Sequence, residues 1–260
     1  QDQFDVLLNL GYDWLPLWLT PRTQTPLAHL VSMGSVSAAM DAVIARISAS
    51  HPRHLAFHSA SQAADFDLSQ PPLLLGNGFD LERYRFSAHP TNQLGWAGRV
   101  APEKGLEDAA AAAAQLGLPL VVMGLVEDRQ YAARVEASVP AGTLIWRGFL
   151  EAADLQAELG RCRALLNTPK WNEAFGNVVV EALACGVPVA TYARGGPGEL
   201  IQDGCNGALA RPDEVQDLVA ACQRALAIDR AACRRWAETH CSLAGFALRV
   251  ETWLQELQRA

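Results

Sequence analysis

From about residue 94 onward, short apolar runs alternate with stretches of helical pattern, and this alternation constrains the fold more than any other feature of the sequence. The candidate strands are QLGWAGRV, LPLVVMG, TLIWRGF, ALLNTP, VPVATY and NGALA, and the candidate helices cover residues 103–117, 151–161, 177–185, 213–227 and 230–240. Strands that are almost wholly apolar are buried on both faces, and strands joined through helices run parallel with right-handed crossovers. The pattern predicts a doubly wound α/β domain, in which ligands bind beyond the carboxyl ends of the strands.

The chain is long enough for two hydrophobic cores, because 260 residues exceed the usual size of one domain. Its first 90 residues are less regular, with strands expected near residues 4–9, 27–31 and 54–58 and a helix over 35–50. Proline and glycine are frequent over residues 69–93, which predicts a linker there. We therefore expect three segments: a partial α/β lobe over 1–90, a complete domain over 91–243 and a C-terminal helix over 244–260.

Composition and charge exclude several classes of protein. Half of the residues are hydrophobic and 19% are charged, which excludes disordered, collagen-like and coiled-coil chains. The net charge of −7 argues against a nucleic-acid partner. The six cysteines include no C-x-x-C pair, and no apolar run approaches the ~20 residues that span a bilayer. We expect a reduced, cytoplasmic protein.

Common cofactor and hydrolase motifs are absent from the sequence. There is no G-x-G-x-x-G after a strand, no P-loop, no H-E-x-x-H and no G-x-S-x-G, which argues against dinucleotide oxidoreductases, P-loop NTPases, zinc proteases and α/β-hydrolases. Asp65 and Asp67 form a D-x-D pair, but no third ligand lies nearby in the sequence. We expect no metal and no cofactor.

Two cations flank a short loop between a candidate strand and a candidate helix. The strand ends at Gly98 and Arg99, and Lys104 precedes the helix. Arginine offers a planar fork of donors, lysine a compact charge, and a helix N-terminus adds backbone N–H groups and the positive end of its dipole. The pattern indicates a phosphate site; the alternative is an exposed pair of cations on a solvated loop.

Two glutamates bracket the start of another candidate helix. Glu173 precedes the helix, so its side chain is free to turn into a cleft and accept hydrogen bonds from ligand hydroxyls. Glu181 lies among valines, alanines and leucine, and a buried carboxylate there needs a partner. The alternative is a capping Glu173 and an ordinary exposed Glu181.

These motifs, in this order, resemble the retaining nucleotide-sugar glycosyltransferases of family 4, which have the two-lobed GT-B fold. The resemblance runs from about residue 57 to 258. It rests on GNGFDLERY, GRVAPEKG, NEAFGNVVVEALACGVPVA with its E-x7-E spacing, and GGPGELIQDGCNGALA.

The resemblance implies an α/β protein with two Rossmann-like lobes, a partial acceptor-side lobe and a complete donor-binding domain, with the C-terminal helix packing back toward the first lobe. It implies that Arg99 and Lys104 hold the donor diphosphate, that Glu173 accepts hydrogen bonds from the sugar, and that Glu181 binds the ribose. The remaining donor-binding positions that it implies are Gly98, Phe175, Gly176, Asn177, Val178, Gly195 and Gly196. The base would be bound by backbone around Gly148 to Leu155, with UDP expected first and GDP second.

The match in the first lobe is short, and it makes His29, in TPLAHLV, a further catalytic candidate. Family members carry a further βαβ portion before FDVLLNL, so we expect a truncated chain or a short form that a partner completes. The function expected is hexosyl transfer with retention and without metal to an unidentified acceptor, with membrane contact only if that acceptor is a lipid. The alternative is a donor-binding module without turnover of its own.

Overall fold

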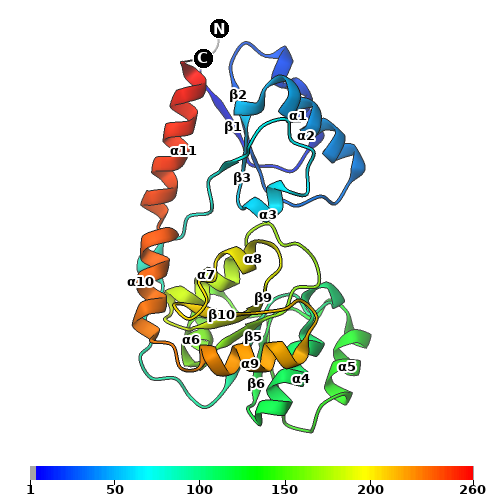
Figure 1. Ribbon diagram of the computed structural model, residues 1–260, viewed down its shortest axis with the longest axis vertical. Helices are drawn as coiled ribbons and strands as arrows, with labels where there is room; N and C mark the ends of the chain where they lie inside the picture. Colours follow the sequence, from blue (N-terminus) through cyan, green and yellow to red (C-terminus); the bar gives the residue numbers. More distant parts are fainter. Residues whose placement is uncertain (1–3, 260) are drawn as a thin grey trace. The chain divides into compact units, whose positions relative to one another are not determined.

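The structure, a computed structural model, describes residues 4–259 and divides into two compact units (Figure 1). The first unit comprises the chain up to Phe79, residues 172–175 and the chain from Cys241. The second comprises residues 80–171 and 176–240. The chain therefore crosses between the units four times, once on each side of Glu173.

The second unit is built on a six-stranded parallel sheet in the order β10-β9-β8-β5-β6-β7. The strands are β5 (Leu94–Ala97), β6 (Leu120–Met123), β7 (Leu144–Gly148), β8 (Leu165–Asn167), β9 (Val189–Tyr192) and β10 (Gly207–Ala210). Taken in chain order, this is the 3-2-1-4-5-6 arrangement of Rossmann-type sheets. All six strands lie within the predicted apolar runs. The strands in the middle of the sheet are buried on both faces, which explains why their sequences are almost continuously apolar.

Helices cover both faces of this sheet. They are α4 (Leu106–Leu116), α5 (Arg129–Ala137), α6 (Ala152–Arg161), α7 (Asn177–Ala184), the short α8 (Gly195–Glu199), α9 (Val215–Ala225) and α10 (Arg230–His240). Small residues let α4 pack closely, because its alanines join Trp96 and Tyr192 in one core together with α5 and α9. On the opposite face, Gly95 lets Cys162, just after α6, approach the sheet, since a Cβ on Gly95 would lie 2.8 Å from the Cys162 sulfur. The unit is a three-layer sandwich.

The first unit has a smaller parallel sheet in the order β1-β2-β3-β4. Its strands are β1 (Leu7–Asn9), β2 (Leu27–Val31), β3 (Leu55–Phe57) and β4 (Leu73–Leu74), and its helices are α1 (Trp14–Leu19), α2 (Ala38–Ser50), α3 (Ala60–Ala63) and α11 (Leu243–Gln258). One face packs Val31 and Phe57 against Ile44 and Ile47 of α2. The other face packs against α11 in a core formed by Ala28, Leu30, Ala56, Leu75, Trp253 and Leu257. The first unit thus has a core on each face of its sheet.

The order of strands reverses between β5 and β8, which lie side by side although they are far apart in the sequence. Two glycines let the backbone come together around this switch point. A Cβ on Gly105, which has φ +64°, would lie 2.1 Å from the Thr168 carbonyl oxygen, and one on Gly124, with φ +144°, 1.9 Å from the Gly98 carbonyl oxygen. Both positions admit only glycine, and both draw loops together where Rossmann-type sheets bind ligands.

The boundaries differ from those expected. Residues 80–90, predicted as part of the first lobe and its linker, belong to the second unit, because Arg230 and Arg234 of α10 bind the backbone carbonyls of Leu81, Tyr84 and Ser87. The C-terminal helix is grouped with the first unit. The ends of the expected outer segments, Gln1 to Gln3 and Ala260, lie outside the described residues.

Candidate functional site

A cavity of about 370 Å³ opens at the switch point of the second unit. It is lined by loops that follow three neighbouring strands and by one side of α7, through Ala97, Gly98, Arg99, Met123, Gly124, Leu125, Phe149, Leu150, Leu155, Val178 and Glu181. Leu125 and Phe149 are 61% and 67% exposed, unusually high for large apolar side chains. The walls are therefore mainly apolar, and the charged groups among the lining residues are Arg99 and Glu181. Such a lining suits a flat, partly apolar ligand that carries both hydroxyl groups and negative charge.

Glu181 presents a carboxylate to this cavity from the middle of α7. The Tyr84 hydroxyl donates a hydrogen bond of 3.4 Å to Glu181 Oε1. Burial raises the pKa of Glu181, and the bond from Tyr84 opposes that rise. Burial and the Glu181 charge together raise the pKa of Tyr84 to about 12, so its hydroxyl is a donor at neutral pH. The partner that the buried carboxylate required is thus a tyrosine, which sequence reasoning missed because it lies 97 positions away.

Arg99 lines the same cavity, and its guanidinium forms ion pairs with Glu103, at 3.0 Å, and with Glu127. The hydrogen bond with Glu127 is the main cause that raises the pKa of Arg99. All three side chains are substantially exposed, so a phosphate group could displace either carboxylate at little cost. The position predicted for a phosphate ligand is therefore occupied by the protein's own carboxylates.

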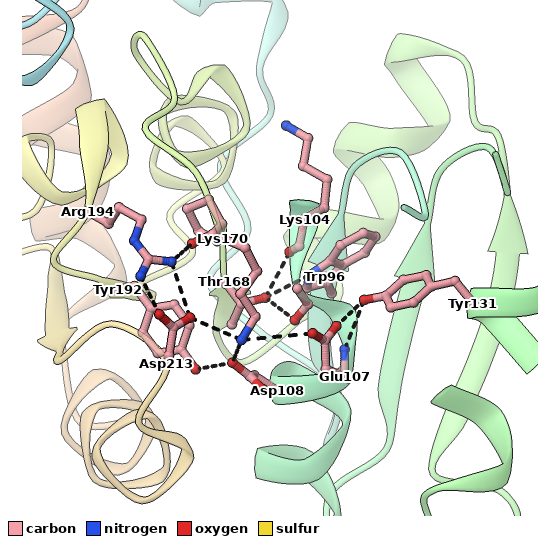
Figure 2. Close-up of polar contacts among 12 residues, drawn as sticks. Trp96, Lys104, Glu107, Asp108, Tyr131, Thr168, Lys170, Tyr192, Arg194 and Asp213 are labelled. Atoms are coloured by element: carbon pink, nitrogen blue, oxygen red, sulfur yellow. Dashed lines mark hydrogen bonds and ion pairs between the residues drawn. The ribbon is translucent and has the colours of Figure 1, made fainter. Parts of the chain in front are cut away.

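Lys104 ends the 3-10 turn Pro102–Lys104 that leads into α4. Its ammonium lies 5.6 Å from the centre of the Trp171 ring. The Thr168 hydroxyl, which follows β8, bonds the carbonyl oxygens of Lys104 and Gly105 at 3.2 and 2.7 Å. Figure 2 shows the Lys104 side chain extending away from the polar groups below it. The loop after β5 is thus fastened to the loop after β8.

A second polar cluster ties together the loops after β8, β9 and β10 (Figure 2). Lys170 pairs with Asp108 and, at 3.1 Å, with Asp213, and the Tyr192 hydroxyl donates to Asp108 at 2.6 Å. Arg194 pairs with Asp213 and bonds the Pro169 carbonyl at 2.9 Å. The positive charges of Lys170 and Arg194 are neutralised by these carboxylates. The two side chains therefore hold the loops together and are not exposed cations. No short motif predicts this cluster, since its members come from four separate segments.

The helix α7 begins at a glycine that the structure requires. Gly176 has φ +95°, and a Cβ there would lie 2.7 Å from Pro197. The backbone N–H groups of the first turn, which include those of Asn177 and Val178, point toward the N-terminal end of the helix. Gly195 and Gly196 are buried at the start of α8, which contains Pro197. The predicted glycines therefore bring the starts of α7 and α8 together.

Glu173 and Phe175 lie in the segment that is grouped with the first unit, whereas Gly176 and Glu181 belong to the second. Glu173 is 9% exposed. The Ser59 hydroxyl donates to the Ala174 carbonyl at 2.7 Å, and the Phe175 ring lies 6.1 Å from that of His58. The two glutamates of the E-x7-E signature are thus held by different units.

His29 is buried within β2 and is 1% exposed. Its Nδ1 lies 3.1 Å from the Asn9 amide and its Nε2 2.7 Å from the Thr20 hydroxyl. Burial and the nearby His54 lower the pKa of His29 to about 4, so the ring is neutral near pH 7. Both ring nitrogens are engaged inside the first unit, and this favours a structural role over the catalytic one that we expected.

The Asp65–Asp67 pair is not assembled into a cation site. Asp65 accepts a hydrogen bond from Asn172 at 3.1 Å, while Asp67 lines an open groove beside Pro71 and Pro72. Among residues 4–259 there is no group of three or more histidine, cysteine, aspartate or glutamate side chains arranged to hold a metal. Nor does that part of the chain contain a helix with the length and apolar character needed to cross a bilayer.

Several known proteins are similar to this chain. It is 33% identical over 174 residues to a glycogen synthase of Mycobacterium tuberculosis, a match covering 62% of this chain and 41% of that protein. It is 37% identical over 111 residues to a 2-deoxystreptamine N-acetyl-D-glucosaminyltransferase of Streptomyces fradiae, covering 40% and 26%. The chain thus matches less than half the length of these relatives.

The fold is that of the GT-B glycosyltransferases. The structure of Anabaena Alr3699/HepE in complex with UDP matches with a TM-score of 0.83 at 19% identity, covering 98% of this chain and 79% of that one. The model of the family described as glycosyl transferases group 1 matches residues 83–240, more than half of the chain and nearly all of the unit that contains the cavity. On this match the chain belongs to the glycosyl transferases group 1 family.

Proposed function

We propose that this protein transfers a hexosyl group from a nucleoside diphosphate sugar to an acceptor hydroxyl, with retention of configuration and without a metal. The observation that carries the proposal is the cavity at the switch point, where apolar walls, one carboxylate and one guanidinium meet. Its volume of about 370 Å³ is near the lower end for ligand pockets. This size suits a bound nucleoside whose diphosphate extends out of the cavity opening.

Different residues bind the base, the ribose and the diphosphate of the donor. Leu125, Phe149 and Leu155 form the surface against the base, and Glu181 accepts hydrogen bonds from the ribose hydroxyls. Arg99 takes the diphosphate once Glu103 or Glu127 yields, and Lys104 approaches it from the turn before α4.

The chemical step needs the leaving diphosphate to be stabilised as negative charge develops on it. Two cations and the first amides of α7 supply that stabilisation, so no bound cation is required. Glu173 holds the hydroxyls of the donor sugar, and the acceptor hydroxyl attacks from the side on which the diphosphate leaves. No nucleophile from the protein enters this mechanism.

UDP is the donor nucleotide that we favour, with GDP second. Support comes from similar folds, since Anabaena Alr3699/HepE has structures titled with UDP, with UDP and glucose, and with UDP-glucose. A GDP-mannose-dependent alpha-mannosyltransferase of Mycolicibacterium smegmatis, 36% identical over 108 residues, keeps GDP as the alternative. We place the reaction in the cytoplasm, where these donors are made available and where the free cysteines stay reduced.

Calorimetric titration with UDP, GDP, ADP and NAD tests the proposal. Binding of one nucleoside diphosphate, lost in Arg99→Ala but retained in Arg129→Ala on the exposed start of α5, supports it. Binding of none of them, or of NAD alone, refutes it. Release of sugar from the matching donor, with an acceptor or by slow hydrolysis, separates an enzyme from a donor-binding module without turnover.

A further inference from the structure

Tyr84 is a residue of the second unit that donates directly to a cavity carboxylate without itself lining the cavity. It follows the short 3-10 turn Leu81–Arg83, and its hydroxyl donates to Glu181 Oε1 at 3.4 Å. Its backbone carbonyl accepts from Arg234 of α10, and its hydroxyl is the end that contacts a cavity residue. The residue is therefore placed to act on a ligand only through Glu181.

The position of Tyr84 is fixed by one arginine. The Arg234 guanidinium donates to the carbonyl oxygens of Tyr84 at 2.7 Å, Leu81 at 3.0 Å and Ala184 at 2.8 Å. Ala184 is the last residue of α7, the helix that carries Glu181. A single planar side chain thus fastens the backbone of Tyr84 and the helix of Glu181 to each other, which keeps the hydroxyl and the carboxylate in register.

We propose that Tyr84 is a positioning residue that fixes the Glu181 carboxylate for recognition of the ribose, and so sets the preference for ribonucleotides over deoxyribonucleotides. This inference rests on the proposed function and deepens it. A carboxylate has two oxygens with about four acceptor positions. Occupying one position on Oε1 leaves Oε2 and the remaining lone pair to accept from the two ribose hydroxyls, and it limits rotation about the terminal torsion of the side chain.

The protonation states agree with this role. Burial and the Glu181 charge raise the pKa of Tyr84 to about 12, so the hydroxyl keeps its proton at neutral pH. The hydrogen bond from Tyr84 also opposes the burial that raises the pKa of Glu181. Tyr84 therefore helps to keep Glu181 in the anionic form, which accepts hydrogen bonds from hydroxyls more strongly than the neutral acid does.

Tyr84→Phe tests the inference, because it removes only the hydroxyl. Tyr131→Phe is the matched control: Tyr131 also donates to a glutamate, Glu107, in the same unit, but neither residue lines the cavity. Both variants and the wild type are titrated calorimetrically with the preferred nucleoside diphosphate and with its 2′-deoxy and 3′-deoxy analogues. Thermal unfolding of each variant checks that it is folded.

We expect Tyr84→Phe to weaken the ribonucleotide roughly 3- to 10-fold, the cost of one hydrogen bond, and to weaken at least one deoxy analogue clearly less. Tyr131→Phe should leave the ratio of ribo to deoxy affinity unchanged. In a Glu181→Ala background, the Tyr84→Phe change should have little further effect, because the side chain that accepts from Tyr84 is gone.

Three outcomes overturn the inference. An unchanged affinity ratio in folded Tyr84→Phe, or an equal loss for the ribonucleotide and both analogues, means that Tyr84 does not act on the ribose. A full additional loss in the Glu181→Ala background means that it does not act through Glu181. If the wild type binds no nucleoside diphosphate, the proposed function falls first and the role of Tyr84 falls with it.

Discussion

Glu181→Gln should change the stability of the free protein and its affinity for nucleotide in opposite directions. Burial on α7 raises the pKa of Glu181 above its ordinary 4.5, so the folded protein holds that proton more tightly than the unfolded chain does. The carboxylate therefore costs no stability below pH 4.5, and its cost is complete once the pH exceeds the folded pKa. Removing the charge should therefore stabilise the free protein at pH 7 and raise its melting temperature.

The same change should weaken nucleotide binding, because it replaces charge-assisted hydrogen bonds to the ribose with weaker neutral ones. Losing about 1.5–3 kcal/mol of such bonding corresponds to roughly 10- to 150-fold in affinity. Calorimetry with UDP and differential scanning calorimetry of the free protein measure the two effects. Glu256→Gln, at an exposed glutamate on α11 outside the cavity, is the control and should change neither. A lower melting temperature with weaker binding would make Glu181 a structural residue, and unchanged affinity would remove it from the ribose site.

Three further changes probe other parts of the molecule. Glu127→Gln should strengthen UDP binding up to ~5-fold, because it frees Arg99 from an exposed ion pair worth about 0.2–1 kcal/mol. The affinity for uridine, which has no phosphate, should stay the same. Equal effects on both ligands in calorimetry would contradict this. Arg234→Ala should remove about 2–3 kcal/mol of bonding to three carbonyls and lower the melting temperature by roughly 4–12 °C, whereas exposed Arg235→Ala should not. The pKa of His29 is lowered to about 4, so its protonation opposes folding as the pH falls. Between pH 6.5 and pH 4 the free energy of unfolding of the first unit should fall by about 3 kcal/mol in the wild type but not in His29→Gln. Urea unfolding measures this difference, and parallel pH profiles of the two proteins would refute it.

The sheet of the second unit was predictable because its inner strands are buried on both faces and are therefore largely apolar. The predicted strand VPVATY contains β9, and the predicted helix 230–240 matches α10 at both ends. The helix α5 was not predicted. Its sequence RQYAARVEA is largely polar because one side faces solvent, and its start depends on the Asp128 side chain, which accepts from the Tyr131 amide.

The sequence predicted the main residues of the candidate site but not their partners. Arg99, Lys104 and Glu181 stood out through local spacing, as did the glycine at the start of α7. Their partners did not, because Glu127 lies 28 positions from Arg99 and Tyr84 lies 97 from Glu181. Such pairs follow from how the strands are ordered in space, and no short motif encodes that order. The catalytic role of His29 stays a prediction, since a histidine in a strand looks the same in sequence whether its ring faces a ligand or, as here, contacts polar groups at both nitrogens.

The strands of the first unit are synthesised long before α11, the helix that covers one face of their sheet. Trp253 and Leu257 cover the strand residues Ala28, Leu30 and Ala56, and the Trp253 indole donates to the Arg53 carbonyl, 200 positions earlier in the chain. At typical elongation rates those strands leave the ribosome roughly 10 to 40 seconds before the helix that covers them. The first unit therefore begins before the second unit and is completed after it, and its apolar sheet face lacks its helical cover during that interval.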